Sequence, residues 1–325
     1  MQRSQVAKSF PTLVLQRTLQ ALLATVAVLT IGFVLLNLAP GDPVTYILGD
    51  ASDPVLAEQI RERLGLDAPL HVRYLTYVDG VLHGQLGRSY VYGRPVSDMI
   101  FSRVPATLLL FASQFLVSSV LGITLGALAA YRKGSWLDKG VIALSISWYS
   151  VPVFWSGQLL LILFALRLGW FPVFGMSSLT TDLPPAIDVL WHLALPTLTL
   201  SLLFSALIAR LTRAAMVEAL EEDYITTARA KGVSEFAVVK HAARNALLPV
   251  ATVLALNLGQ AMAGAVLTET VYSWPGLGRL MFDAIGSRDY PLVLGLFWFI
   301  SFMVILANLI ADLGYAVLDP RVRYR

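Results

Sequence analysis

Six stretches without a charged residue constrain this chain more than any other feature of its sequence. They cover residues 18–41, 104–131, 140–166, 189–209, 245–268 and 290–311, and each is 21 to 28 residues long. A helix needs about 20 apolar residues to cross a hydrocarbon layer of about 30 Å. The apolar runs are continuous and lack the alternation of lipid-facing strands. The sequence therefore predicts an all-α, polytopic membrane protein with six transmembrane helices.

Composition supports this class. Charged residues make up 14% of the chain and hydrophobic residues 57%, whereas about 25% of a soluble domain is charged. The net charge is +3, and a small excess of Lys and Arg in a membrane protein usually belongs to its cytoplasmic loops, so we expect no nucleic-acid partner. The chain has no cysteine, which excludes disulfides, Cys-ligated zinc and thiol catalysis.

The distribution of Lys and Arg predicts the orientation. Segments 1–17, 132–139, 210–246 and 312–325 hold 15 of the 24 Lys and Arg residues, so the positive-inside rule assigns them, and both termini, to the cytoplasm. Segments 39–103 and 269–289 are then extracytoplasmic. The first span, 18–38, lacks a small-residue cleavage site and is interpreted as a retained anchor. The other predicted spans, within one domain, are 104–131, 140–166, 189–209, 247–268 and 290–311.

The long outer segment, 39–103, contains two amphipathic patterns. Asp53 and Pro54 form a helix start, and Gly65 stands where a helix ends. A second amphipathic piece runs from about Leu70 to Leu82. These helices are expected either to lie at the membrane surface over the mouth of the bundle or to form a docking surface for an external protein.

The segment 210–246 predicts two short helices joined at a glycine. Asp223 can cap the first, Gly232 ends it, and Ser234 can cap a second helix that runs toward Pro249. Small residues would let another protein approach this backbone closely, and Arg229 would offer it a charged anchor. The alternative is a basic loop that lies on anionic lipid.

This segment carries a family resemblance. Residues 218–220 (Glu-Ala-Leu), 223–232 (Asp-Tyr-Ile-Thr-Thr-Ala-Arg-Ala-Lys-Gly) and 241–249 (His-Ala-Ala-Arg-Asn-Ala-Leu-Leu-Pro) resemble the coupling loop of ATP-binding-cassette importer permeases of the dipeptide/oligopeptide/nickel branch. Further along the chain, seven more segments resemble the first of that branch's two permease subunits. They are residues 39–43, 64–70, 84–89, 103–108, 269–278, 288–291 and 319–323. The loop departs from the form of sugar importers, because Glu218-Ala219 stands thirteen residues before Gly232. Glu218 is therefore not assigned the role that form gives its glutamate.

The resemblance implies a type I importer permease fold in the bacterial inner membrane. It implies a second homologous permease, two ATPase subunits that bind ATP and Mg, and an extracytoplasmic substrate-binding protein. The expected cargo is a short peptide, with nickel chelates, glutathione or another small solute as alternatives. Nucleotide-driven closure of the ATPases would switch access from outside to inside.

Three sets of candidate site residues follow. The coupling set, through the resemblance, comprises Asp223, Tyr224, Thr227, Ala228, Arg229, Ala230, Lys231, Gly232, His241, Arg244 and Asn245. The set that would contact the binding protein, also through the resemblance, comprises Asp42, Arg88, Trp274, Arg288 and Asp289. Polar residues of the spans, which line a path or bond neighbouring helices, are Ser145, Ser147, Trp148, Tyr149, Gln158, Asn257, Gln260 and Asn308, joined by Pro152, which would kink the third span.

Motifs for catalysis are missing from the sequence. It contains no Gly-x-x-x-x-Gly-Lys-Ser/Thr loop, no His-Glu-x-x-His pair and no Gly-x-Ser-x-Gly turn. We expect no enzyme activity and no metal site, and His192 is interpreted as a packed or interfacial side chain. The span centres carry no charge, which disfavours a gradient-driven carrier, the alternative from another functional class. Gly122, Gly126 and Ala130 form a small-residue face for close helix packing.

Overall fold

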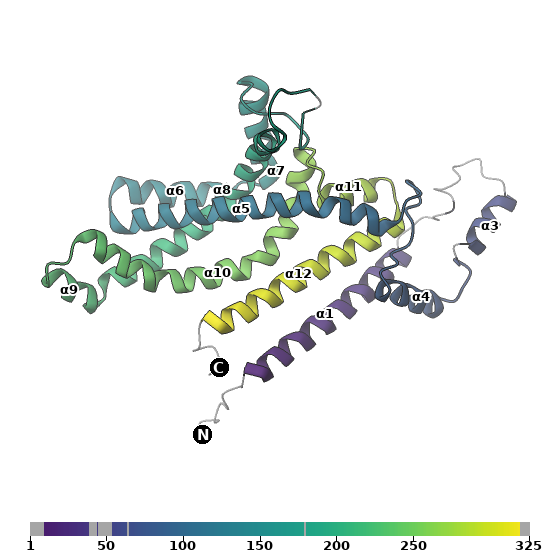
Figure 1. Cartoon of the computed structure of the whole chain (residues 1–325), viewed down its shortest axis with the longest axis horizontal. Helices are drawn as coiled ribbons and strands as arrows, with labels where there is room; N and C mark the ends of the chain where they lie inside the picture. Colours follow the sequence, from purple (N-terminus) through teal and green to yellow (C-terminus); the bar gives the residue numbers. More distant parts are fainter. Residues whose placement is uncertain (1–9, 39–43, 45–53, 64, 179, 319–325) are drawn as a thin grey trace. The chain divides into compact units, whose positions relative to one another are not determined.

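The computed structural model describes residues 10–38, 44, 54–63, 65–178 and 180–318 (Figure 1). Within these ranges the side chains of residues 10, 11, 13, 36, 63, 255–265 and 311–318 are not described. Helices make up the regular structure, and no strand occurs in the described ranges. The chain divides into two compact units, residues 1–107 with 276–325, and residues 108–275.

Unit 1 (residues 1–107 and 276–325) pairs the two ends of the chain. α1 (Phe10–Leu38) lies alongside α12 (Tyr290–Leu318), as Figure 1 shows. The beginning of α5 (Val96–Tyr131) and the short α11 (Leu277–Gly286) pack with α12 around a core that includes Ile100, Leu280 and Leu296. A Cβ atom added at Gly295 would lie 2.5 Å from Cγ1 of Val96, so glycine permits this close packing.

Two short helices lie between α1 and α5. They are α3 (Pro54–Arg63) and α4 (Leu70–Leu82), and they confirm the two amphipathic helices predicted for segment 39–103. Gly65 has a φ of +64°, and the N–H of Leu66 donates to the carbonyl oxygen of Arg61 at 3.0 Å. This is the glycine-dependent helix end that the sequence indicates. The predicted cap, Asp53, lies outside the described residues.

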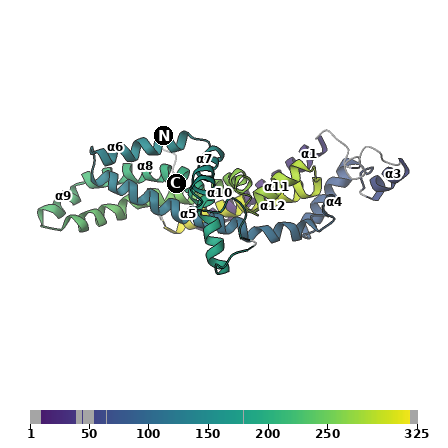
Figure 2. The same ribbon diagram turned by 90° about the horizontal axis from the view of Figure 1, so that it is seen from above.

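Unit 2 (residues 108–275) holds the remaining helices. They are α6 (Trp136–Ser150), α7 (Val153–Leu160), the π-helix η1 (Leu161–Arg167), α8 (Pro185–Glu221), α9 (Asp223–Ala230) and α10 (Glu235–Val271). α6 runs alongside α8 in both views (Figures 1 and 2). The predicted small-residue face packs here, because Cβ atoms added at Gly122 and Gly126 would lie 2.5 Å from Cβ of Ile208 and from the carbonyl oxygen of Ala209.

Four described helices are long and apolar enough to cross a membrane. They cover 14–35, α5, α8 and 290–310, and α6 with α7–η1 makes a fifth if this bent pair counts as one span. The predicted window 247–268 lies within α10, where the side chains of 255–265 are not described. The count of six spans therefore stays a prediction.

The predicted kink at Pro152 is present. α6 and α7 meet at an angle of 105°, and the break falls at Val151 and Pro152. Proline has no N–H to continue the helical ladder and disfavours helical backbone at the preceding residue. Val151 accordingly has an extended conformation, with φ −89° and ψ 130°.

The helices around segment 210–246 run further than the charge-free windows. α8 continues to Glu221, and α10 begins at Glu235 and passes through Pro249. The expectation of a second short helix that ends near Pro249 is therefore wrong. Charged residues are good helix formers, so they mark where the membrane ends rather than where the helix ends.

Candidate functional site

The coupling segment, defined as residues 210–246, is a packed corner of three helices. Ile225 of α9 is fully buried against Met216 of α8 and against Val238 and Ala242 of α10. Val238, Ala242 and Ala246 repeat every four residues, which gives α10 one apolar stripe. The corner is therefore held by an apolar core and presents its polar residues to the outside.

Gly232 terminates α9 in a Schellman motif. Its φ is +73°, its N–H donates to the carbonyl oxygen of Arg229 at 2.9 Å, and the N–H of Val233 donates to that of Ala228 at 3.2 Å. The side chain of Ser234 then accepts from the N–H of Ala237 and caps α10, as the sequence predicts. The prediction that Asp223 caps α9 is wrong, because Asp223 is the first residue of the helix and Glu222 stands at the cap without a side-chain bond.

The outward side of α9 is polar. Thr227, Arg229, Ala230 and Lys231 are exposed. Arg229 forms a two-pronged ion pair with Glu235, with Nε–Oε1 at 3.0 Å and Nη2–Oε2 at 3.3 Å. This exposed pair spans Gly232 and links the end of α9 to the start of α10. Arg229 is thus presented in a fixed orientation.

The remaining members of the coupling set lie on α10. Asn245 donates from Nδ2 to the hydroxyl of Tyr224 at 2.9 Å, which joins α10 to the first turn of α9. His241 and Arg244 are exposed. A pocket of about 260 Å³ opens beside this bond, and the carboxylates of Glu218 and Glu222 line it.

Two ion pairs fix the coupling segment to the segment 132–139. Arg213 of α8 donates to both carboxylate oxygens of Asp138, with Nη2–Oδ2 at 2.8 Å, and Asp138 also accepts from the N–H of Gly134 at 2.9 Å. The side chain of Asp138 is 4% exposed and that of Arg213 is 24% exposed. Lys133 pairs with Glu221 at the exposed end of α8. Two predicted cytoplasmic segments are thereby joined.

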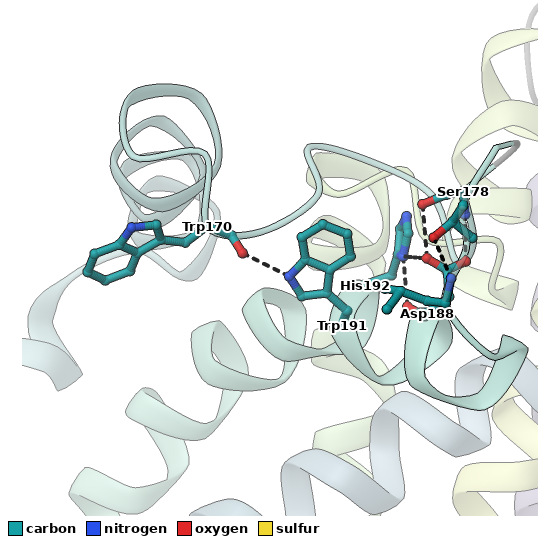
Figure 3. Close-up of polar contacts among 7 residues, drawn as sticks. Trp170, Ser178, Asp188, Trp191 and His192 are labelled. Atoms are coloured by element: carbon teal, nitrogen blue, oxygen red, sulfur yellow. Dashed lines mark hydrogen bonds and ion pairs between the residues drawn. The ribbon is translucent and has the colours of Figure 1, made fainter.

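The opposite end of α8 carries a second buried network, drawn in Figure 3. The carboxylate of Asp188 accepts from the N–H and the hydroxyl of Ser178 at 2.7 and 2.9 Å. Nδ1 of His192 lies 2.9 Å from the carbonyl oxygen of Asp188. Nε1 of Trp191 donates to the carbonyl oxygen of Trp170 at 2.8 Å. His192 is buried, as predicted, and this network ties the loop before α8 to the helix.

The proposed path residues of the third span follow α6 to its break. Ser145 is buried, Trp148 is half-buried, and the hydroxyl of Ser147 donates to its own helix at the carbonyl of Ala143. Tyr149 is exposed, and the Arg210 guanidinium lies 5.1 Å from its ring centroid. Gln158 in unit 2 and Asn308 in unit 1 are exposed; Asn257 and Gln260 lie outside the described side chains. That these residues line a path stays a prediction.

Two family profiles cover nearly the whole chain. The profile described as the inner membrane component of binding-protein-dependent transport systems matches residues 122–324, and that for the N-terminal part of such membrane components matches residues 11–111. The chain belongs to this family. It is therefore a permease, the transport component of such a system, and a multi-pass protein of the inner membrane.

Named relatives of this permease come from several bacteria. It is 42% identical over 312 residues to the di/tripeptide transport system permease protein DppB of Pseudomonas aeruginosa, covering 90% of this chain and 93% of that protein. A probable peptide ABC transporter permease protein of Sinorhizobium fredii is 42% identical, with 94% and 98% covered. A putative peptide permease protein of Brucella suis is also 42% identical, with 95% and 98% covered.

The permease presents only part of the set predicted to meet a binding protein. In unit 2, Trp274 is fully buried. In unit 1, Asp289 is fully buried and caps α12, while it accepts from the hydroxyl of Ser89 and the N–H of Tyr90. These two side chains have structural contacts instead of an accessible surface. Arg88 and Arg288 are exposed, and Asp42 lies outside the described residues.

Sequence reasoning missed several contacts that build the permease. The pair of Asp138 with Arg213 gave no signal, because charged residues near span ends are expected to face water. The pairing of the exposed Arg229 with Glu235 depends on the turn at Gly232, which no charge pattern specifies. Ile225 could have been found, since it is the apolar residue of α9 one turn before Arg229. The four-residue spacing of Val238, Ala242 and Ala246 also indicates a buried stripe.

Proposed function

We propose that this permease forms half of the translocation path of an ATP-driven importer of di- and oligopeptides. The observation that carries the proposal is 42% identity, across at least nine tenths of the chain, to proteins named as di/tripeptide or peptide permeases. Peptide cargo is favoured over nickel chelates or glutathione, because the named relatives carry peptide in their names.

ATP hydrolysis is assigned to partner subunits. This chain has no Gly-x-x-x-x-Gly-Lys-Ser/Thr loop to hold phosphate, so partner subunits must bind ATP and Mg. The proposed complex contains two such ATPase subunits. One of them receives the coupling segment, with α9 as the coupling helix. Its apolar core and the Schellman turn at Gly232 support this role, since a rigid corner can transmit a displacement to α8 and α10.

The mechanism is alternating access. A second homologous permease completes the path, and an extracytoplasmic binding protein delivers the cargo. Closure of the ATPases on nucleotide moves both coupling segments, and the permeases switch as rigid bodies between outward and inward access. Both termini and the coupling segment are assigned to the cytoplasm, and the excess of Lys and Arg in these segments supports this orientation.

Uptake by the reconstituted complex tests this proposal. The permease, its second permease, the ATPases and the binding protein are placed in liposomes with a labelled dipeptide. We expect uptake to require ATP on the side of the membrane that carries the ATPase subunits. It should also require the binding protein on the opposite side. Uptake driven by a proton gradient without ATPases would contradict the proposal, as would a complex that carries nickel chelates or glutathione and no peptide.

A further inference from the structure

Unit 1 contains a pocket of about 370 Å³ that lies apart from the coupling segment. α1, α4, the loop 85–90 and the start of α12 supply its walls. Its lining includes Phe33, Arg73, Tyr77, Tyr90 and Tyr290. The volume falls in the range of small-molecule sites. Three phenol rings and one guanidinium supply the pocket with hydrogen-bond donors and a positive charge.

Aromatic packing holds the α4 wall of the pocket against α1. The Phe33 ring stacks on that of Tyr77 at 5.9 Å between centroids and meets the edge of Tyr74 at 5.3 Å. The hydroxyls of Thr30 and Tyr74 lie 2.7 Å apart. These contacts order the residues of α4 before any ligand arrives, which lowers the entropic cost of binding.

Arg73 is the charged group of this pocket. Its side chain is half-buried, and neither a hydrogen bond nor an ion pair joins it to another described residue. The nearby carboxylate of Asp289 is already engaged by Ser89, Tyr90 and Val91. The half-buried guanidinium lines an open pocket without a counter-charge among the described residues, so it can pair with an anion that enters the pocket.

The phenols add neutral donors around this cation. Burial raises the pKa of Tyr77 to about 12, and burial followed by the charge of Asp289 raises the pKa of Tyr90. The charge of Arg73 acts in the opposite direction on the pKa of Tyr90 and is the smallest of the three causes. Both phenols therefore stay protonated at neutral pH and can donate hydrogen bonds.

A planar guanidinium with O–H donors matches a carboxylate, because Arg can bind both carboxylate oxygens at once. The aromatic walls match an apolar group next to that carboxylate. The open pocket, at about 370 Å³, has room for the terminal residue of a peptide. A pocket of this kind suits a small carboxylic acid better than an extended protein surface.

We propose that the Arg73 pocket, the cavity lined by Arg73, Tyr77, Tyr90 and Tyr290, binds the C-terminal carboxylate of the peptide cargo. This inference rests on the proposed function and adds a permease residue that recognises cargo. Arg73 pairs with the carboxylate, the phenols donate to it, and Phe33 contacts the adjoining side chain. The pocket thus receives cargo before it enters the translocation path.

The test compares a dipeptide with its C-terminal amide. The complete complex, reconstituted with its binding protein, is prepared with Arg73→Gln, with Arg73→Lys and with the control Arg94→Gln, which removes an exposed cation that does not line the pocket. For the acid we expect kcat/KM to fall about tenfold in Arg73→Gln and less in Arg73→Lys. For the amide the change stays within twofold, and the control changes neither.

The ratio of kcat/KM for the acid to kcat/KM for the amide reports on the pocket alone. The same binding protein serves every reaction, so its own preference for the carboxylate cancels between wild type and variant. Unchanged ATPase activity without cargo verifies that the variants assemble. Equal losses for acid and amide would overturn the proposal and assign Arg73 to a lipid phosphate or to a carboxylate of the binding protein; no loss for either would also overturn it. A wild-type complex that takes up neither peptide refutes the proposed function, and this inference with it.

Discussion

Asp138 joins α6 to α8 in unit 2, although the sequence shows it only as a charged residue just before a predicted span. Its carboxylate accepts from Arg213 twice and from the backbone of Gly134, and it is almost fully buried. Removing the charge would leave the Arg213 guanidinium partly buried without a partner, which is more costly than the pair is worth by itself. The pair therefore keeps α6 and the end of α8 in one register.

We predict that Asp138→Asn lowers the free energy of unfolding by about 2 kcal/mol, because Arg213 loses its counter-charge. Lys133→Gln is the matched control, since it breaks the exposed pair with Glu221 and should cost less than about 1 kcal/mol. Thermal unfolding of the purified permease measures both. Equal effects would mean that burial adds nothing to the Asp138 pair.

We also predict that substitution of Gly232 weakens the end of α9. Nothing lies within 4 Å of a Cβ atom added there, so Gly232→Ala acts through its φ of +73° alone. The strained backbone should lower the local stability of α9 by about 1 kcal/mol, which corresponds to roughly fivefold faster amide hydrogen exchange in this helix. Gly232→Asn should have a smaller effect, because Asn tolerates this conformation. Faster exchange with Asn than with Ala would refute this explanation.

At the scale of elements, glycines and proline set how the helices of unit 2 meet. Gly126 brings α5 onto the backbone of α8, and Pro152 separates α6 from α7. Both features were predictable, because small-residue spacing and a mid-span proline have direct geometric consequences. The helix ends were not, since α8 and α10 continue through charged sequence that the membrane windows exclude.

Gly126→Ala is expected to destabilise the permease by about 2 kcal/mol, because the new methyl would lie 2.5 Å from a backbone carbonyl oxygen. Gly140→Ala provides the contrast. It places the same methyl group in open space on α6 and should stabilise by about 0.5 to 1 kcal/mol. Melting temperatures of the two variants should move in opposite directions. An unchanged or raised melting temperature in Gly126→Ala would contradict the close approach of α5 and α8.

The coupling segment carries a prediction about charge. Reversal at Arg229 and Lys231 is expected to lower peptide uptake by the reconstituted complex at least about tenfold, because two charged contacts to the ATPase are lost. The helices should stay folded, since both side chains are exposed. Helical content and melting temperature of the variant test this second part.

A charge swap separates docking from internal structure. Arg229→Glu combined with Glu235→Arg restores the pair across Gly232 but reverses the charge offered by α9. If Arg229 contacts the ATPase, uptake stays low in the swap. Recovery of uptake would mean that Arg229 serves only the internal pair and would remove it from the coupling surface.

At the scale of the whole molecule, sequence motifs identified more than local patterns could. The quoted motifs, in their order along the chain, indicated the family that the two profiles establish. Buried polar contacts were beyond reach, because Asp138 and Arg213 lie 75 residues apart and Ser89 and Asp289 lie 200 apart. Such pairs depend on tertiary packing, which no local pattern encodes.

This permease is proposed to couple ATP hydrolysis by partner subunits to uptake. The most direct measurement is purification of the chain from its native membrane in mild detergent, with identification of the proteins that accompany it and an ATPase assay of the product. We expect a second permease and two ATPase subunits to co-purify, and we expect the binding protein loaded with peptide to raise ATP hydrolysis. A chain that purifies alone, without ATPase activity, and catalyses proton-coupled uptake in liposomes would contradict this proposal.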